Sequence, residues 1–304
     1  MSEDQKPPRR PARRPNSSGK RPGETNRPAN RSAYRPSAPR REDDEGASDG
    51  GRGARRTPGG WDAIATWYDG WVGKGGSEHH KRLAIPTVMD LLQSRPREQV
   101  LDVGCGQGVL APSVAETGAS YTGVDVSPKL LELARQHHGG KGRFLRADAA
   151  NLQGTDGLQA ASFDAAVFLL SIQDMDPLSD VLESAAWVLK PGGRVVLLMT
   201  HPAFRIPRQS GWGFDEGRKL IYRRVDRYLT PLPVPMKQHA SGVTISFHRP
   251  LNAYINGLGA VGLYTDRIEE VPAVDTGLKK QRDRAQEAAD AEIPLFLGLR
   301  ARKQ

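Results

Sequence analysis

The chain has 304 residues, a formal net charge of +9 and a single cysteine, Cys105. One cysteine excludes a disulfide framework and a metal site built from several thiolates, and we predict no metal site. The sequence contains no run of eighteen apolar residues and no apolar leader with a cleavage site. It therefore predicts no membrane insertion and favours a cytoplasmic protein.

Residues 1–57 differ in composition from the rest of the chain. Pro, Arg, Gly, Ser and Asn dominate them, Tyr34 is their only aromatic residue, and residues 1–58 hold fifteen Lys or Arg against eight Asp or Glu. Such a segment buries too little apolar surface to offset the entropy of ordering, so we predict a disordered arm followed by one domain, residues 58–304. The arm is either a solubilising extension or a weak, salt-sensitive contact for nucleic acid and acidic surfaces.

The first predicted elements of the domain are a helix, a strand and a glycine loop. Residues 81–93 carry apolar side chains at helical spacing, and the apolar run at 100–103 predicts a strand. Gly104, Gly106 and Gly108 follow and predict a tight turn and the start of a helix. Glycine lets the backbone approach a ligand, and a helix N-terminus offers free N–H groups, so the pattern indicates a nucleotide-type site.

Two carboxylates distinguish this loop from a dinucleotide site. Dinucleotide loops read G-x-G-x-x-G, whereas the glycines here alternate and Asp102 precedes them. An acid at that position would repel a pyrophosphate and suits a ligand with an ammonium group. Asp125 ends a second predicted strand, 120–126, at about the distance from which an acid accepts ribose hydroxyls.

Helices and strands alternate through the rest of the core. A helix is predicted at 127–139 and a further helix from 176 with Gly192 as its stop. This alternation predicts a parallel sheet covered on both faces, with a ligand at the carboxyl ends of its strands.

These ordered segments resemble the class I S-adenosylmethionine-dependent methyltransferases, and Trp67-Tyr68-Asp69 resembles the aromatic-Asp pair that precedes the core in their small-molecule, quinone-biosynthesis-like branch. The matching segments are the glycine loop at 100–110, the strand at 120–126, Arg146-Ala147-Asp148-Ala149, the strand at 163–170, and the helix, turn and strand at 187–198. The resemblance implies a Rossmann-like α/β fold with a seven-stranded, mostly parallel sheet and helices on both faces.

The same resemblance assigns the C-terminal part of the chain. It implies a final helix and turn at 254–263 and last strands at 268–271 and 293–301, the seventh strand being antiparallel. Residues from about 200 to 249 would then form a substrate lid insertion, or else a surface used for dimerisation.

The resemblance also implies S-adenosylmethionine as the cofactor. The glycine loop would lie under its methionine portion, Asp125 would bind both ribose hydroxyls, and Asp148 would face the adenine amino group. Tyr68 would cover the cofactor or pack in the core, and Asp125 alone could also be a helix cap. The expected cofactor-binding residues are Asp102, Gly104, Cys105, Gly106, Gly108, Asp125, Val126, Asp148, Ala149, Leu169 and Tyr68.

Methyl transfer needs a base only when the attacking atom must lose a proton. The candidate catalytic residues are His201, directly after the fifth strand, and Gln173 and Asp174, after the fourth. His201 is equally well explained as a strand-end histidine bonded to backbone, and Asp174 as a helix cap. The candidate substrate-binding residues, for an anionic or aromatic substrate, all lie in the lid segment and are Arg205, Arg208, Tyr222 and Tyr228.

The leading interpretation is methyl transfer to a small-molecule acceptor by in-line displacement, where positioning can remove roughly 7–11 kcal/mol of a barrier. The sequence leaves open whether O, N or C is methylated, and in which oligomeric state. Two alternatives remain, an RNA or DNA methyltransferase that uses the basic arm and a non-catalytic cofactor-binding or RNA-associated module. Residues 171–174, Ser-Ile-Gln-Asp, lack the Asn/Asp-Pro-Pro-aromatic motif of enzymes that methylate amino groups of nucleic acid.

Overall fold

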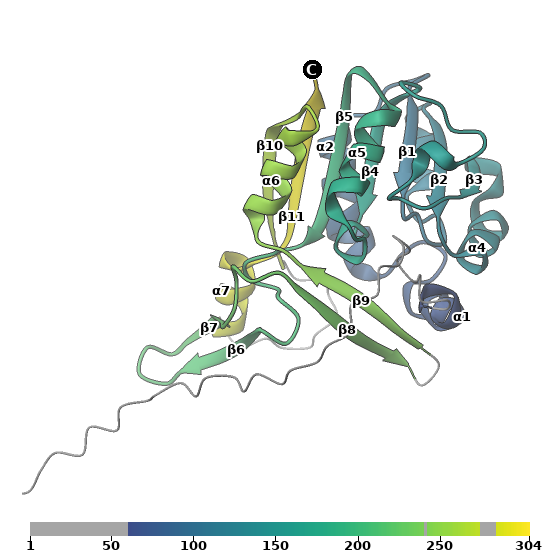
Figure 1. Ribbon diagram of the computed structural model, residues 1–304. Coiled ribbons are helices and arrows are strands. Elements are labelled where there is room, and N and C mark those ends of the chain that lie inside the picture. Colours follow the sequence, from purple (N-terminus) through teal and green to yellow (C-terminus); the bar gives the residue numbers. More distant parts are fainter. Residues whose placement is uncertain (1–59, 240–241, 274–283) are drawn as a thin grey trace, which may run out of the picture. The chain divides into compact units, whose positions relative to one another are not determined.

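The computed structural model describes residues 60–239, 242–273 and 284–304, so the predicted arm lies outside the described residues. A seven-stranded sheet in the order β10-β11-β5-β4-β1-β2-β3 organises this part of the chain (Figure 1). Its strands are β1 (Gln99–Val103), β2 (Ser120–Asp125), β3 (Arg143–Arg146), β4 (Phe163–Leu169), β5 (Leu189–Thr200), β10 (Leu263–Pro272) and β11 (Pro294–Lys303). β11 runs antiparallel to both of its neighbours, whereas the pairs from β5 to β3 are parallel. The predicted α/β sheet with its antiparallel seventh strand is confirmed.

Helices cover both faces of this sheet (Figure 1). Those on one face are α2 (Ile85–Leu92), α3 (Ala111–Glu116) and α4 (Pro128–His138), and those on the other are α5 (Leu178–Val188) and α6 (Leu251–Ala260). Helix α4 starts where its local sequence predicts, because Ser127 Oγ accepts a hydrogen bond from the Leu130 N–H and Pro128 occupies the first helical position.

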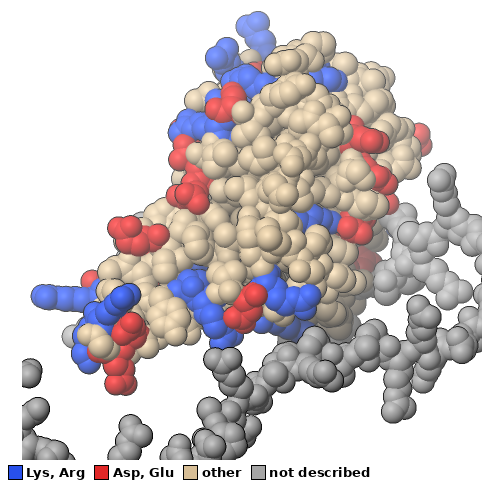
Figure 2. Space-filling view, turned by 60° about the vertical axis from the view of Figure 1, so that its left-hand side comes forward, with Lys and Arg blue, Asp and Glu red and all other residues tan. Residues whose placement is uncertain are grey.

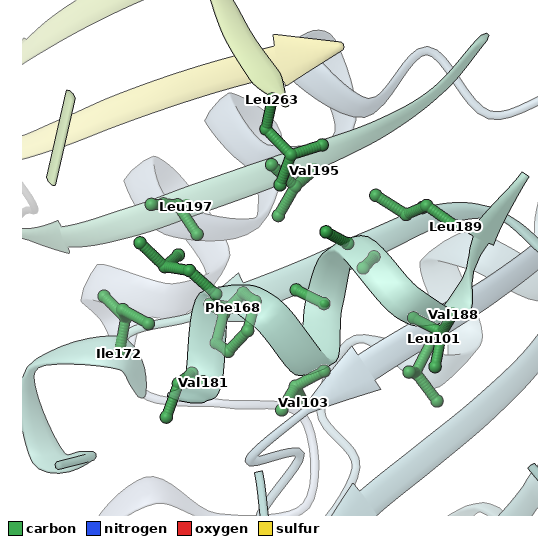
Figure 3. Close-up of a cluster of buried hydrophobic side chains, with 14 of the residues drawn as sticks. Leu101, Val103, Phe168, Ile172, Val181, Val188, Leu189, Val195, Leu197 and Leu263 are labelled. Carbon is green, nitrogen blue, oxygen red and sulfur yellow. The ribbon is translucent and has the colours of Figure 1, made fainter. Parts of the chain in front are cut away.

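The core consists of two layers of apolar side chains, one on each face of the sheet. Leu101 and Val103 of β1 pack with Phe168 beneath α5 (Figure 3), whereas Val100 packs on the opposite face with α2. Successive strand residues point to opposite faces, and both faces are covered, so the strands are continuous apolar runs. Full burial of one such side chain contributes roughly 1.5–3 kcal/mol to stability.

Several elements differ from the predictions, among them β10, which begins at Leu263 instead of 268. Helix α5 ends at Val188, and β5 begins at the next residue. Gly192 (φ +75°) therefore lies near the start of β5 and does not end the helix. The last helix begins earlier than predicted, at Leu251. Helix α7 (Arg284–Glu292) was not predicted, because it buries only Ala289 and Asp290 and so lacks an apolar stripe.

The predicted lid segment forms two antiparallel hairpins. One pairs β6 (Ser210–Asp215) with β7 (Leu220–Val225), and the other pairs β8 (Leu232–His239) with β9 (Gly242–His248). β9 packs against α1 (Gly60–Val72) and the short helix η4 (Ile172–Asp174), whereas β7 packs against α7. The second hairpin therefore meets the loops at the carboxyl ends of the parallel strands.

The charges of the described part are mixed in sign. On the face shown in Figure 2, Lys and Arg side chains lie next to Asp and Glu side chains. Residues 59–304 hold 29 Lys or Arg and 27 Asp or Glu. Across the described ranges, every helix falls short of the length and apolarity that a membrane span requires.

Candidate active site

A cavity of about 270 Å³ lies where the carboxyl ends of β1, β2 and β4 meet helix α1. This is the place where open α/β sheets bind ligands. Nine of the predicted site residues line the cavity, namely Tyr68, Gly104, Gly106, Asp125, Val126, Asp148, Ala149, Leu169 and Asp174.

The glycine loop after β1 forms the floor of this cavity. The backbone N–H groups of Gly104 and Cys105 both donate to the Val124 carbonyl, at 2.8 and 3.0 Å, which ties the loop to β2. Gly104 has a φ of +74°, and a Cβ placed on it would lie 2.6 Å from Met175 Cε and 2.7 Å from Ser171 Cβ. A side chain at this position would therefore clash with the loop after β4 and adopt a strained backbone.

Asp125, at the end of β2, holds the loop from the other side. Its Oδ2 accepts from the Gly106 N–H and its Oδ1 from the Ser127 N–H, both at 2.9 Å. Burial raises the pKa of this carboxyl, and the backbone N–H donors oppose that rise. Each carboxylate oxygen retains a second lone pair, so Asp125 can accept hydrogen bonds from the hydroxyl groups of a ligand in the cavity that it lines.

A smaller cavity of about 20 Å³ adjoins the first and shares Tyr68, Gly104, Gly106 and Leu169 with it. Asp102 lies in it and is 1% exposed. The Tyr121 hydroxyl donates to Asp102 Oδ2 at 2.7 Å, whereas Asp102 Oδ1 is buried without a hydrogen-bond partner. Burial raises the pKa of Asp102 to about 7.

A second buried acceptor without a partner, Gln107 Oε1, belongs to the lining of the same small cavity. Buried polar atoms are almost always hydrogen-bonded in native proteins. Two unpartnered acceptors at one end of the site therefore fit a ligand end with several N–H donors, such as the ammonium group of S-adenosylmethionine.

Helix α1 closes the site from above with Trp61 and Tyr68, whose ring centroids lie 5.3 Å apart. Asp62 of α1 accepts from Ser127 Oγ at 2.5 Å and from the Lys129 N–H at 3.2 Å, which attaches α1 to the start of α4. Burial raises the pKa of the Tyr68 hydroxyl well above its usual value, so this hydroxyl stays protonated. Tyr68 thus lies where the cofactor-covering interpretation places it.

Asp174 is the candidate catalytic residue that reaches the cavity. It lies in η4 after β4, and Ser246 of β9 donates a hydrogen bond to its carboxylate. Burial raises the pKa of Asp174 to about 7. Gln173 does not line the cavity, because its Nε2 donates to the Leu170 carbonyl at 2.6 Å and so stays within its own loop.

The expected position of His201 at the mouth of the site is wrong. His201 is 4% exposed, its Nε2 bonds Glu270 Oε1 at 2.9 Å, and its Nδ1 accepts from the Ala203 N–H at 3.2 Å. The reason is topological: β5 lies between β4 and β11, so the residue after it meets β10 and β11 instead of the glycine loop. Its pKa is lowered by burial.

The four expected substrate-binding residues of the lid do not line the cavity either. Arg205 donates to the carbonyls of Pro294 and Ile293, and Arg208 donates to the Pro235 carbonyl. Tyr222 is 49% exposed on β7. The Tyr228 hydroxyl accepts from the Leu251 N–H at 2.9 Å. Arg205 and Tyr228 thus attach the hairpin segment to the rest of the domain, and Arg208 connects the two hairpins.

Two predicted loop residues also lie outside the main cavity. Cys105 lines the small cavity, and burial raises the pKa of its thiol well above the usual value, so it stays protonated. Gly108 packs against α4 and β3, since a Cβ on it would lie 2.9 Å from the Phe144 ring. Its glycine is required for packing, not for contact with a ligand.

Eleven lining residues were not predicted, and they are Trp61, Val103, Val124, Leu130, Ala147, Ala150, Leu170, Ser171, Met175, Asp176 and Val181. One sequence signal could have found Trp61. It precedes Tyr68 by seven residues, so the two side chains share one face of α1. Ser246, in contrast, reaches Asp174 from 72 positions further along the chain, and no local pattern marks it.

Comparison with known proteins agrees with this geometry. Residues 101–197 match the family described as methyltransferase domain. A demethylmenaquinone methyltransferase of Tropheryma whipplei is 39% identical over 106 residues, which are 34% of this chain and 43% of that protein. A ubiquinone biosynthesis O-methyltransferase of Xanthomonas axonopodis pv. citri is 29% identical over 139 residues, 45% of this chain and 58% of that protein. The chain thus spans about half the length of the curated relatives it matches.

A solved structure extends the likeness beyond the matched segment. An S-adenosylmethionine-dependent methyltransferase from Mesorhizobium loti aligns at 28% identity with a TM-score of 0.61, covering 76% of this chain and 100% of its own. The predicted family and the cofactor, S-adenosylmethionine as methyl donor, are confirmed. Residues 101–197 therefore carry a methyltransferase domain, and the fold around them is similar to that of a solved S-adenosylmethionine-dependent methyltransferase.

Proposed function

We propose that this chain transfers the methyl group of S-adenosylmethionine to a small-molecule acceptor. The observation that carries this proposal is the chemical difference between the two ends of a site made of two adjoining cavities. One end holds the unpartnered acceptors Asp102 Oδ1 and Gln107 Oε1, and the other end holds Asp174 beside apolar side chains. The first end suits the ammonium end of the cofactor, and the second leaves a carboxyl group for the acceptor.

Within the cofactor part of the site, each residue has a proposed task. Asp102 accepts from the ammonium group, Asp125 accepts from the ribose hydroxyls, and Asp148 lies where the adenine amino group can donate to it. Tyr68 covers the cofactor from α1. The bound cofactor supplies a methyl group already activated by its sulfonium, so these residues contribute alignment and the exclusion of water.

Asp174 is the proposed general base when the acceptor atom must lose a proton. A carboxyl group with a pKa near 7 is ionised in part of the molecules at neutral pH and is a stronger base than an ordinary aspartate. The hydrogen bond from Ser246 stabilises the ionised form. His201 and Gln173 take no part in this proposal, because neither lines the cavity: His201 bonds Glu270, and Gln173 donates its Nε2 to the Leu170 carbonyl.

The relatives that act in menaquinone and ubiquinone biosynthesis support a small-molecule acceptor. The mixed charge of the face in Figure 2 gives no support to a nucleic-acid substrate on that side.

Two measurements test the proposal. Calorimetry should detect binding of S-adenosylhomocysteine and S-adenosylmethionine, and no binding of a nicotinamide dinucleotide. Incubation of the full chain with methyl-labelled cofactor should then place label in a metabolite extract, and not in bulk RNA or DNA. Label in nucleic acid would favour the alternative that uses the basic arm, and cofactor binding without transfer to any of the three would favour a non-catalytic module.

The Asp125→Ala variant serves as the negative control for label transfer. Asp156→Ala, which removes an exposed acid outside the cavity, is the matched positive control.

A further inference from the structure

The part of the cavity formed by Trp61 and the loop at 170–176 is here called the acceptor end. Trp61, Leu170 and Met175 give it apolar walls, and Asp174 and Asp176 are its ionisable groups. Gly104 of the glycine loop lies against Ser171 of the loop at 170–176, and both line this cavity. A molecule bound at the acceptor end therefore lies directly beside the proposed cofactor part of the site.

The ionisable groups that line the whole cavity are of one sign. They are Asp125, Asp148, Asp174 and Asp176, and among the described residues no Lys, Arg or His joins them in the lining. A cleft lined by one sign of charge within low-dielectric walls focuses its field onto a ligand.

The two carboxylates of the acceptor end differ in how they are compensated. Asp176 forms an ion pair with Arg249, at 2.7 Å, and lies exposed at the rim. Asp174 receives the Ser246 hydroxyl, and among residues 60–239, 242–273 and 284–304 no ion pair is formed by it. Asp174 therefore presents a carboxylate to the acceptor without a cation to offset it.

Arg249 does not reverse this balance. Its Nη2 donates to both Asp176 Oδ1 and the Met175 carbonyl at 2.7 Å, and among the described residues its buried Nη1 has no hydrogen-bond partner. Its side chain is not part of the cavity lining, and its charge is offset by Asp176.

We propose that the acceptor is an uncharged or cationic molecule with a flat apolar body and an O–H or N–H group that donates to Asp174, and that the site rejects anionic acceptors. This inference rests on the proposed function and deepens it, since it names the class of substrate. Placing a carboxylate beside the uncompensated Asp174 sets like charges together in a poorly solvated site. The apolar walls favour a planar ring against Trp61.

The test uses the full chain saturated with S-adenosylhomocysteine and three phenols that differ in charge. These probes are 4-hydroxybenzyl alcohol, which is neutral, tyramine, which is cationic, and 4-hydroxybenzoate, which is anionic. Affinities are measured at pH 8 by saturation-transfer NMR titration. We expect the neutral and cationic probes to bind at least about tenfold more tightly than the anion.

The Asp174→Asn variant assigns this discrimination to one residue. It should bring the three affinities to within about twofold of one another, while the affinity for S-adenosylhomocysteine and the melting temperature stay close to those of the wild type. Asp180→Asn removes an exposed acid six positions away, outside the cavity lining, and should keep the full discrimination.

Three results would overturn the inference in a protein that binds S-adenosylhomocysteine. They are equal or tighter binding of 4-hydroxybenzoate, no binding of any of the probes, and discrimination that persists unchanged in Asp174→Asn. A chain that fails to bind S-adenosylhomocysteine would instead contradict the proposed function, and the inference would fall with it.

Discussion

At the scale of single residues, the site is organised by carboxyl groups whose surroundings differ. Asp125 accepts two backbone N–H groups, Asp102 accepts one tyrosine hydroxyl, and Asp174 accepts a serine hydroxyl. The same residue type therefore serves three proposed tasks, and each task can be tested by its own substitution.

Replacing Asp125 by Ala should weaken binding of S-adenosylhomocysteine measured by calorimetry. The variant loses charge-assisted hydrogen bonds worth about 1.5–3 kcal/mol, which corresponds to roughly 10- to 150-fold in affinity. Asp156→Ala is the control and should bind as the wild type does. Unchanged affinity of Asp125→Ala would remove this residue from the cofactor site.

The rate of methyl transfer to an acceptor that must lose a proton should fall as the pH decreases through about 7. Asp174 acts as the base in its ionised form, and its raised pKa of about 7 sets this limb of the profile. In Asp174→Asn the rate at pH 8 should drop by about 10²- to 10⁴-fold and the limb should disappear. A limb that persists in the variant would assign the titration to another group.

Asp102 should make stability depend on pH in a defined direction. Its pKa is about 7 in the folded chain and 3.8 in the reference state, so the folded state binds more protons between these values. Protonated Asp102 therefore stabilises the folded state fully below about pH 4. This contribution to the free energy of unfolding decreases as the pH rises and is lost once the pH has passed through 7. Urea unfolding should therefore show Asp102→Asn gaining stability relative to the wild type from pH 4 to pH 8. A constant difference between the two proteins would contradict the raised pKa.

At the scale of elements, one side of the site is formed by loops of the parallel sheet, and the other side is formed by elements that are distant in the sequence. The loop after β1 and the end of β2 are adjacent because parallel strands align their carboxyl ends. Helix α1 and β9 are distant in the sequence and pack against each other above that edge. Access to the site therefore depends on how firmly α1 is attached.

Asp62→Ala should loosen α1 from α4 and speed the release of S-adenosylhomocysteine in stopped-flow measurements. Asp62 accepts from the Ser127 hydroxyl and the Lys129 N–H at the start of α4, and a hydrogen bond to a charged group contributes about 1.5–3 kcal/mol. The cavity lining itself does not include Asp62. If α1 stays in place without this contact, the release rate will equal that of the wild type.

At the scale of the whole molecule, both apolar clusters are formed by residues of the C-terminal domain. Their members run from Leu83 to Ala301, on both faces of one sheet. Cooperative unfolding of the domain is therefore expected to depend on this sheet and its helices.

Deleting residues 1–57 should leave the melting temperature nearly unchanged, because the composition of that segment offers too little apolar surface to offset the entropy of ordering it. Differential scanning calorimetry of the full and shortened chains measures this directly. A large drop in the shortened chain would show that the arm stabilises the domain.

The sequence by itself determined the elements whose signals are local. The alternating glycines, the acids at the ends of β1 and β2, and the Ser127-Pro128 helix start each act through neighbouring backbone, so eight of the eleven expected cofactor-binding residues line the main cavity. Asp102 and Cys105 line the small cavity instead, and Gly108 packs against Phe144.

Only the tertiary structure decided the acceptor half of the site. His201 and the lid arginines carry suitable chemistry, yet the neighbours of β5 and the folding of 200–249 into two hairpins direct them elsewhere. Trp61 and Ser246 lie at the acceptor half instead, because α1 and β9 pack at the edge of the sheet. The physical reason is that backbone conformation depends mainly on residues that are near in the sequence. The site that a side chain enters depends instead on which apolar surfaces, distant in the sequence, are buried together.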